Sequence, residues 1–280
     1  MSKKTITMLH PGEMGAAIGA GLIARGHRVL WASAGRGDAS RKRAEGSGFE
    51  DAGTLARAVR EADIVFSVCP PHAALELARA VAACGFGGVY VDANAVSAET
   101  ARAVGRLVEA AGASYIDAGI IGPPPVPGAS VRLYLCGSRA GDIAALFEGC
   151  ILQAIVLEGD VGTASALKVC YAAWNKGATA LLGAIRALAG REGVDAALID
   201  EWSISLPAIP KRSEAVRTSA RKAWRWIAEM EEIAASFEAA GLPAGFHLAA
   251  ADIYRRLEGF KDAANPPDLS EVKAALLRRP

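Results

Sequence analysis

Lys168 is the residue of this 280-residue chain that is best suited to acid–base chemistry. It is the only charged residue between Asp160 and Lys176, in a stretch made mostly of Ala, Leu, Val, Cys, Tyr and Trp. An ammonium in apolar surroundings can stabilise a developing negative charge and deliver a proton to it. The alternative is a lysine whose stem lies in the core and whose amine reaches the surface. We expect the catalytic role.

A glycine-containing turn near the N-terminus could hold phosphate groups. Residues 4–33 read KTITMLHPGEMGAAIGAGLIARGHRVLWAS, which predicts a strand, a turn, a helix and a second strand. In a G-x-G-x-x-G turn the second glycine lets the main chain approach a pyrophosphate, and the third lets the helix pack closely on the strand. Gly12 and Gly15 fill these positions, whereas His10 stands at the first. We expect cofactor binding here; the alternative is a glycine turn that binds no nucleotide.

The end of the second predicted strand bears on the choice between NAD and NADP. An acidic residue there would hydrogen-bond the ribose 2′-hydroxyl of NAD. The chain has Ser33 and Arg36 instead, and no carboxylate occurs between the end of this strand and Asp38. A small hydroxyl and a guanidinium suit a 2′-phosphate, so NADP is favoured and NAD is possible. The alternative is a solvated basic turn.

The elements that must hold these residues differ between the two halves of the chain. Apolar runs predict strands at Thr5–Leu9, Arg28–Ala32, Asp63–Val68, Val89–Asp92, Tyr115–Ala118, Arg132–Cys136 and Ala154–Leu157, separated by helical segments. This alternation predicts βαβ units with a parallel sheet covered on both faces. Helices are predicted later at Ala164–Ala189, Ala196–Ser205, Ser213–Ala240 and Gly245–Leu257, with one short helix in the tail. The expected class is therefore α/β, with a dinucleotide-binding domain at 1–160 and an all-α domain at 161–280.

Composition narrows the class of partner. The chain has 31 basic and 30 acidic residues and is 52% hydrophobic, without a polybasic tail, so we expect a small-molecule ligand rather than nucleic acid or a membrane. The five cysteines, Cys69, Cys84, Cys136, Cys150 and Cys170, lack the spacing of a metal site or a disulfide framework. No stretch approaches the roughly 18 apolar residues of a spanning helix. We expect a cytoplasmic protein with reduced thiols and no metal.

Several motifs together resemble the β-hydroxyacid dehydrogenase superfamily, which includes 3-hydroxyisobutyrate and 6-phosphogluconate dehydrogenases and the imine reductases. HPGEMG resembles its G-x-G-x-M-G, and VDANAVSAET from Val91 resembles its segment after the fifth strand. YIDAGIIGPP from Tyr115 resembles its substrate loop D-A-P-V-S-G-G. GDVGTASALKVCYAAW from Gly159 resembles G-x-x-G-x-G-x-x-x-K, whose lysine is catalytic. The segment from Trp226 resembles a branch labelled only as NAD(P)-dependent oxidoreductases.

The resemblance implies a Rossmann fold, a homodimer and a set of site residues. Lys168 would be the general acid or base. The cofactor would contact His10, Pro11, Gly12, Glu13, Met14, Gly15, Ser33, Arg36, Cys69, Pro70, Pro71 and Asn94. The substrate would lie near Asn94, Gly119, Ile120, Ile121, Gly122, Tyr171 and Asn175, with Asp117 at the same border.

The chain departs from the superfamily pattern at several positions. Ala172 stands where the superfamily has an asparagine four residues after the lysine, and Asn175 lies farther along the same helical face. Ile121 and Pro123 replace a serine and a glycine of the substrate loop, and Pro123 has no N–H for an anion. We expect an oxidoreductase acting on a carbonyl or alcohol. The alternatives are an imine reductase and a non-catalytic dinucleotide sensor.

Overall fold

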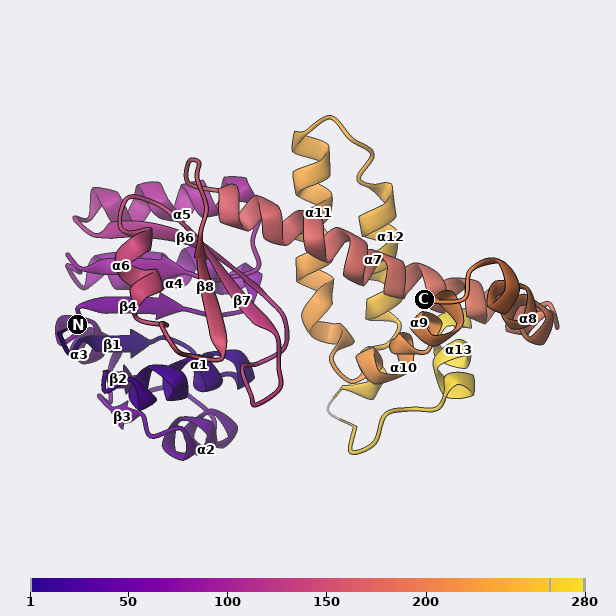
Figure 1. Ribbon diagram of the computed structural model, residues 1–280, viewed down its shortest axis with the longest axis horizontal. Coiled ribbons are helices and arrows are strands. Elements are labelled where there is room, and N and C mark those ends of the chain that lie inside the picture. Colours follow the sequence, from indigo (N-terminus) through magenta and orange to yellow (C-terminus); the bar gives the residue numbers. More distant parts are fainter. Residues whose placement is uncertain (1, 262, 279–280) are drawn as a thin grey trace. The chain divides into compact units, whose positions relative to one another are not determined.

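The computed structural model describes residues 2–261 and 263–278. Contacts between Cα atoms divide the chain into two compact units, Met1–Val169 and Cys170–Pro280. The border lies within the long helix α7 (Thr163–Arg191), which Figure 1 labels. The domain boundary that the sequence predicts, between residues 160 and 161, stays a prediction.

The first unit is built on one eight-stranded sheet. Its strands are β1 (Thr5–Met8), β2 (Arg28–Trp31), β3 (Glu50–Asp51), β4 (Ile64–Ser67), β5 (Val89–Asp92), β6 (Ser114–Ile121), β7 (Val131–Cys136) and β8 (Leu152–Val156). They lie in the order β3-β2-β1-β4-β5-β6-β7-β8. All seven predicted strands are present: Val89–Asp92 has the predicted bounds, and the other six have shifted ends. The sequence missed β3, which has only two residues, both exposed.

The sheet is parallel except at one pair, β6 and β7, which run antiparallel. The parallel sheet that the alternation predicts is therefore present, with one antiparallel pair that it did not predict. The segment between these strands holds GPPPVPG from Gly122, and both of its glycines have positive φ. Because no helix crosses back between β6 and β7, the chain returns directly and the strands pair antiparallel.

Helices cover both faces of the sheet, as the alternation along the chain predicts. Side chains from α1 (Glu13–Ala24), α2 (Asp38–Gly46) and α6 (Ala140–Ala145) pack in one core with Phe66 and Val91. The neighbouring strand residues Val65 and Tyr90 face the second core instead, with α3 (Leu55–Arg60), α4 (Ala74–Ala83) and α5 (Ala98–Ala110). Successive strand residues thus point to opposite, fully covered faces.

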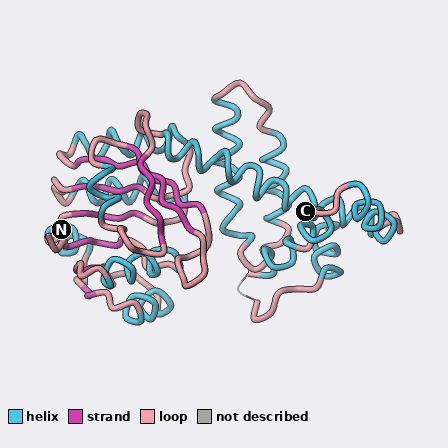
Figure 2. Tube along the Cα trace, in the orientation of Figure 1, coloured by secondary structure: helices cyan, strands magenta, loops and turns pink. Residues whose placement is uncertain are grey.

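The described part of the second unit contains helices and loops without strands, as Figure 2 shows. Its remaining helices are α8 (Asp195–Ser205), α9 (Ile209–Ser213), α10 (Ala215–Ala220), α11 (Trp226–Ala239), α12 (Gly245–Arg255) and α13 (Leu269–Leu277). The single helix expected over Ser213–Ala240 is wrong, because a 3₁₀ turn at Ala223–Arg225 separates α10 from α11. After this turn Trp226 packs edge-to-face on Tyr254 of α12, with ring centres 5.1 Å apart.

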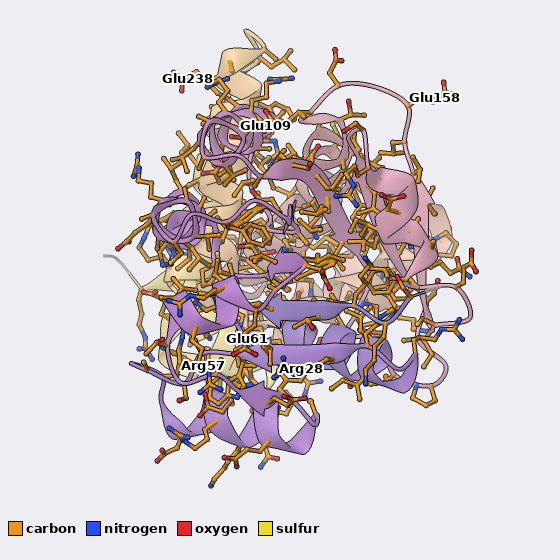
Figure 3. The ribbon with its side chains drawn as sticks, turned by 90° about the vertical axis from the view of Figure 1, so that its left-hand side faces the viewer. Arg28, Arg57, Glu61, Glu109, Glu158 and Glu238 are labelled. Carbon is orange, nitrogen blue, oxygen red and sulfur yellow. The ribbon has the colours of Figure 1, made fainter. Side chains whose placement is uncertain are left out.

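A charged network lies at the amino-terminal edge of the sheet, where Figure 3 labels Arg28, Arg57 and Glu61 close together. Arg28 donates to Glu50 and Glu61, each at 2.8 Å, and Arg57 donates to Glu61 at 3.0 Å. These side chains are largely exposed to solvent, so such pairs contribute little to stability. Among the described residues, no helix is long and apolar enough to cross a membrane.

Candidate cofactor and catalytic site

The direction in which the sheet grows reverses at β1. From β1 the sheet extends through β2 on one side and through β4 on the other. In doubly wound sheets, ligands bind outside the carboxyl ends of the strands at such a reversal. The loop after β1 holds His10 and Gly12, and the loop after β4 holds Cys69 and Pro70. The fold therefore brings the predicted cofactor residues of these two loops to one edge.

Gly12 and Gly15 of the turn have different surroundings. A Cβ atom on Gly15 would lie 2.3 Å from the carbonyl oxygen of His10, so only glycine permits this close approach of α1 to the end of β1. A Cβ atom on Gly12 would meet nothing within 4 Å. Gly12 thus borders open space, as expected where a main chain must approach a ligand.

Two arginines hold the main chain on either side of His10. Arg36 donates to the carbonyl oxygen of Leu9 at 3.3 Å, and Arg43 donates to that of Pro11 at 2.9 Å. Burial, reinforced by the charge of Arg36, lowers the pKa of His10 to about 4. The His10 imidazole is therefore neutral at pH 7, and the positive charge at the turn comes from the arginines.

The N-terminus of α1 is suited to a pyrophosphate. Gly12 starts the helix in an extended conformation, and no side chain caps the first turn. The Met14 side chain packs against the core, and its main-chain N–H belongs to the first turn of the helix. His10 Nδ1 is buried and has no hydrogen-bond partner among the described residues. Unsatisfied N–H groups and the helix dipole favour an anion at this end.

Ser33, expected at the adenosine ribose, lies beside a carboxylate that the sequence reasoning missed. Ser33 donates hydrogen bonds from its hydroxyl and its main-chain N–H to Asp51 at the end of β3. Asp51 also accepts from the N–H of Gly53 at 2.7 Å and lies 3.8 Å from Arg41. Although burial raises the pKa of Asp51, these hydrogen bonds and the charge of Arg41 hold it below its usual value. The pairing of Trp31 with Asp51 creates this proximity, which no local pattern indicates.

Asn94 joins the loops that follow β4 and β5. Its amide oxygen accepts from the N–H of Cys69 at 2.6 Å, and its NH₂ group donates to Ser67 at 2.9 Å and to Asp92 at 2.6 Å. Asn94 is 2% exposed. Both NH₂ hydrogens are thus used inside the protein, and its expected contact with the nicotinamide stays a prediction.

Burial raises the pKa of side chains in two residues that bind Asn94, the Asp92 carboxyl and the Cys69 thiol. Burial raises the pKa of Asp92 to about 6, and hydrogen bonds from Asn94 and Tyr115 oppose this rise. Burial also raises the pKa of the Cys69 thiol to about 12. Cys69 is therefore a neutral thiol at pH 7 and is unsuited to nucleophilic chemistry.

Strand β6 brings Lys168 to the same edge. A Cβ atom on Gly119 would lie 2.7 Å from the carbonyl oxygen of Ala164 and 3.2 Å from Cβ of Lys168, so α7 packs directly on this glycine. Asp92 and Asp117 pair between β5 and β6, and Asn94 and Gly119 each follow two residues later. The stem of Lys168 therefore lies at the edge of the sheet where Asn94 follows the end of β5. Lys168 itself is half-buried.

The other predicted substrate residues differ in burial and belong to different units. Ile120 and Ile121 are buried in β6, and Gly122 starts the exposed loop with φ of 125°. Tyr171 and Asn175 follow Lys168 on α7, are exposed, and belong to the second unit. Among the described residues, no group of three or more His, Cys, Asp or Glu side chains could hold a metal.

Comparisons with known proteins support the resemblance found in the sequence. Residues 5–140 match the NAD binding domain of 6-phosphogluconate dehydrogenase, and residues 189–257 match a domain of unknown function, DUF1932. These two matches, at opposite ends of the chain, agree with its resemblance to the β-hydroxyacid dehydrogenase superfamily. A probable mitochondrial 3-hydroxyisobutyrate dehydrogenase of Dictyostelium discoideum is 24% identical over 180 residues, 60% of this chain and 54% of that protein. The matched part thus spans about half the length of this curated relative.

Solved structures of the superfamily share the fold. The 3-hydroxyisobutyrate dehydrogenase of Mycobacterium tuberculosis has a TM-score of 0.71 at 21% identity, over 99% of this chain and 100% of that one. A reductive aminase from Aspergillus terreus, in complex with NADPH, has a TM-score of 0.59 at 18% identity, over 97% and 98%. The predicted fold class, an N-terminal Rossmann domain followed by helices, is confirmed.

Proposed function

We propose that the chain is an NAD(P)-dependent oxidoreductase that interconverts a small carbonyl compound and its alcohol, with Lys168 as the general acid or base. The observation that carries this proposal is the contact of Lys168 with Gly119, at the sheet edge where α1 also begins. At this edge the uncapped helix start is suited to binding a dinucleotide, and the lysine is suited to transferring a proton. The relatives named as dehydrogenases support the same reaction class.

The chemistry divides between the cofactor and the protein. A bound reduced nicotinamide supplies the hydride that adds to the carbonyl carbon. Lys168 donates its proton to the carbonyl oxygen, which becomes the hydroxyl of the alcohol. In the reverse direction the neutral Lys168 amine accepts the hydroxyl proton. Asn94 holds the loops after β4 and β5 in place, and the first turn of α1 binds the pyrophosphate.

NADP is the preferred cofactor in this proposal. Arg36 and Arg43 lie at the glycine turn, and Arg41 lies beside Asp51 near Ser33. Three guanidiniums outweigh the one carboxylate of Asp51, and guanidinium is well suited to phosphate. The reductive aminase neighbour was solved with NADPH, which supports this choice.

A panel of substrates tests the proposed function. NADPH oxidation is followed with keto acids, aldehydes, ketones and ketone–amine mixtures. Turnover of a carbonyl compound without amine supports the proposal, and turnover only with amine present assigns the chain to imine reduction instead. Saturable NADPH binding without turnover of any class would make it a dinucleotide sensor.

We also propose that the protein is a homodimer that uses α7. Trp174, Leu181 and Leu188 recur at seven-residue spacing along this helix and are 66%, 56% and 56% exposed. Apolar residues with this spacing form one helical stripe, which is typical of a surface that another helix covers. Sedimentation that shows only a 28.9 kDa species would contradict the dimer.

A further inference from the structure

The carboxylate of Asp117 accepts four hydrogen bonds from residues at the start of α7. Its Oδ2 atom accepts from the N–H groups of Gly162 at 2.9 Å, Ala164 at 2.8 Å and Ser165 at 3.2 Å. Its Oδ1 atom accepts from the Ser165 hydroxyl at 2.5 Å. The side chain is fully buried. One carboxylate, from a strand more than 40 residues earlier, thus satisfies the donors at this helix start.

The strand that carries Asp117 cannot move easily. Asp117 pairs with Asp92 of β5 on one side and with Cys136 of β7 on the other. Two residues later on the same strand, Gly119 contacts α7 at Ala164 and Lys168. β6 therefore fixes α7 at two successive turns: Asp117 holds the first turn, and Gly119 receives the turn that bears Lys168.

We propose that Asp117 is the positioning residue for Lys168: by anchoring the start of α7, it sets where the Lys168 amine meets the substrate. This inference rests on the proposed function of Lys168. It replaces the expectation that Asp117 borders the substrate, because all its contacts described above are directed at α7. Charge-assisted hydrogen bonds from a carboxylate to main-chain N–H groups are about twice as strong as neutral ones.

A double-mutant cycle tests this role. Asp117→Ala removes the anchor, and a displacement of a catalytic group by about 1 Å can cost about 10²-fold in rate. We expect kcat to fall by about that factor while the NADPH dissociation constant is unchanged. In the Lys168→Met background the same substitution should cause no further loss. An equal loss in both backgrounds would overturn the proposal.

Asp117→Asn provides the conservative comparison. The amide oxygen can still accept the three main-chain hydrogen bonds, and the NH₂ group can donate to the Ser165 hydroxyl. We therefore expect this variant to keep kcat within about tenfold of the parent. A loss as large as that of Asp117→Ala would show that the charge, rather than the anchoring of α7, is what matters, and would contradict the positioning role.

Hydrogen–deuterium exchange gives a readout that does not depend on turnover. Asp117→Ala should speed exchange of the amides of residues 164–169, and Asp117→Asn should not. Unchanged exchange in Asp117→Ala would overturn the inference. If Lys168→Met alone keeps full turnover, the proposed function fails, and the exchange data still show separately whether Asp117 anchors α7.

Two further variants complete the test. If Asp117→Ala does not fold, Ser165→Ala takes its place in the same double-mutant cycle, because it removes only the hydroxyl hydrogen bond to Asp117. We then expect a smaller loss of kcat, and only when Lys168 is present. Asp268→Ala is the matched control, because Asp268 caps α13, which bears no candidate site residue. It should leave kcat unchanged. A comparable fall in this control would show a general effect of losing a carboxylate cap and would refute the specific role of Asp117.

Discussion

The two helices that meet the candidate site begin in opposite ways. α1 starts at Gly12 without any side-chain cap, and beside this start Arg36 and Arg43 bind main-chain carbonyls of the turn. α7 starts with its donors bound by the buried carboxylate of Asp117. An uncapped start with positive charge around it can receive an anion, whereas a start bound by a carboxylate repels one.

This difference is invisible in the local sequence. Both starts carry two glycines three residues apart, in HPGEMG and in GDVGTA. What separates them is a residue far along the chain, since Asp117 reaches α7 from β6. In our proposal the glycine pattern of α1 marks the cofactor site, whereas that of α7 marks a helix start that Asp117 binds. Three variants test this difference, and they are given from the largest expected effect to the smallest.

Lys168→Met should have the largest effect, because it deletes the charge that α7 presents and keeps the apolar stem. General acid–base catalysis typically contributes about 10²- to 10⁴-fold, so kcat should fall by that order. The NADPH dissociation constant should change little, since the proposed phosphate site lies at α1. Steady-state kinetics and cofactor titration on one preparation measure both quantities.

Thermal unfolding of the same Lys168→Met preparation is the necessary control, because loss of folding also abolishes turnover. Near-parental turnover in a folded variant would mean that Lys168 only reaches toward solvent. The proton donor would then have to be sought at another side chain.

Arg36→Ala should have an intermediate effect, confined to the α1 end. One charge-assisted contact with a phosphate is typically worth about 1.5–3 kcal/mol, so NADPH should bind about 10- to 150-fold more weakly. NADH, which has no 2′-phosphate, should lose much less. Arg57→Ala, in the exposed network with Glu61, is the matched control and should leave both affinities unchanged. Equal dissociation constants for NADPH and NADH in the parent protein would refute the preference.

Much of the fold could be predicted because its signals are local. Apolar runs such as residues 64–67 and 89–92 are fully buried between two helical layers, and they mark their strands without tertiary information. β3 gave no such signal, because two exposed residues carry no apolar pattern. The break before α11 was also missed, and beside it Trp226 contacts Tyr254, which no periodicity near residue 223 indicates.

The candidate site divides in the same way. Gly12, Gly15 and Lys168 were found from spacing within short segments. The bond between Ser33 and Asp51 and the anchoring of α7 by Asp117 join segments that are far apart in sequence, so neither could be predicted. The hydrogen bonds of Asn94 to Ser67 and Asp92 were also not predicted, whereas its expected contact with the nicotinamide stays a prediction.

His10→Gly should have the smallest effect, and it isolates the first position of the turn. The pKa of His10 is about 4 in the folded protein and 6.5 when unperturbed, so between these values the unfolded chain binds a proton that the folded one does not. The parent should therefore lose stability relative to the variant as pH falls from about 6.5 to about 4. Denaturant unfolding at several pH values measures this difference. NADPH affinity at pH 7 should stay within a few-fold; a parallel pH dependence of the two proteins would contradict the buried, neutral imidazole.

The central claim, that the open start of α1 binds the dinucleotide, is tested most directly by titrating the intact chain with NADPH while following its main-chain amide resonances. We predict saturable shifts at Glu13, Met14 and Gly15, with one cofactor bound per chain and a higher affinity for NADPH than for NADH. Amide resonances of these three residues that stay unchanged at saturating NADPH would contradict the claim.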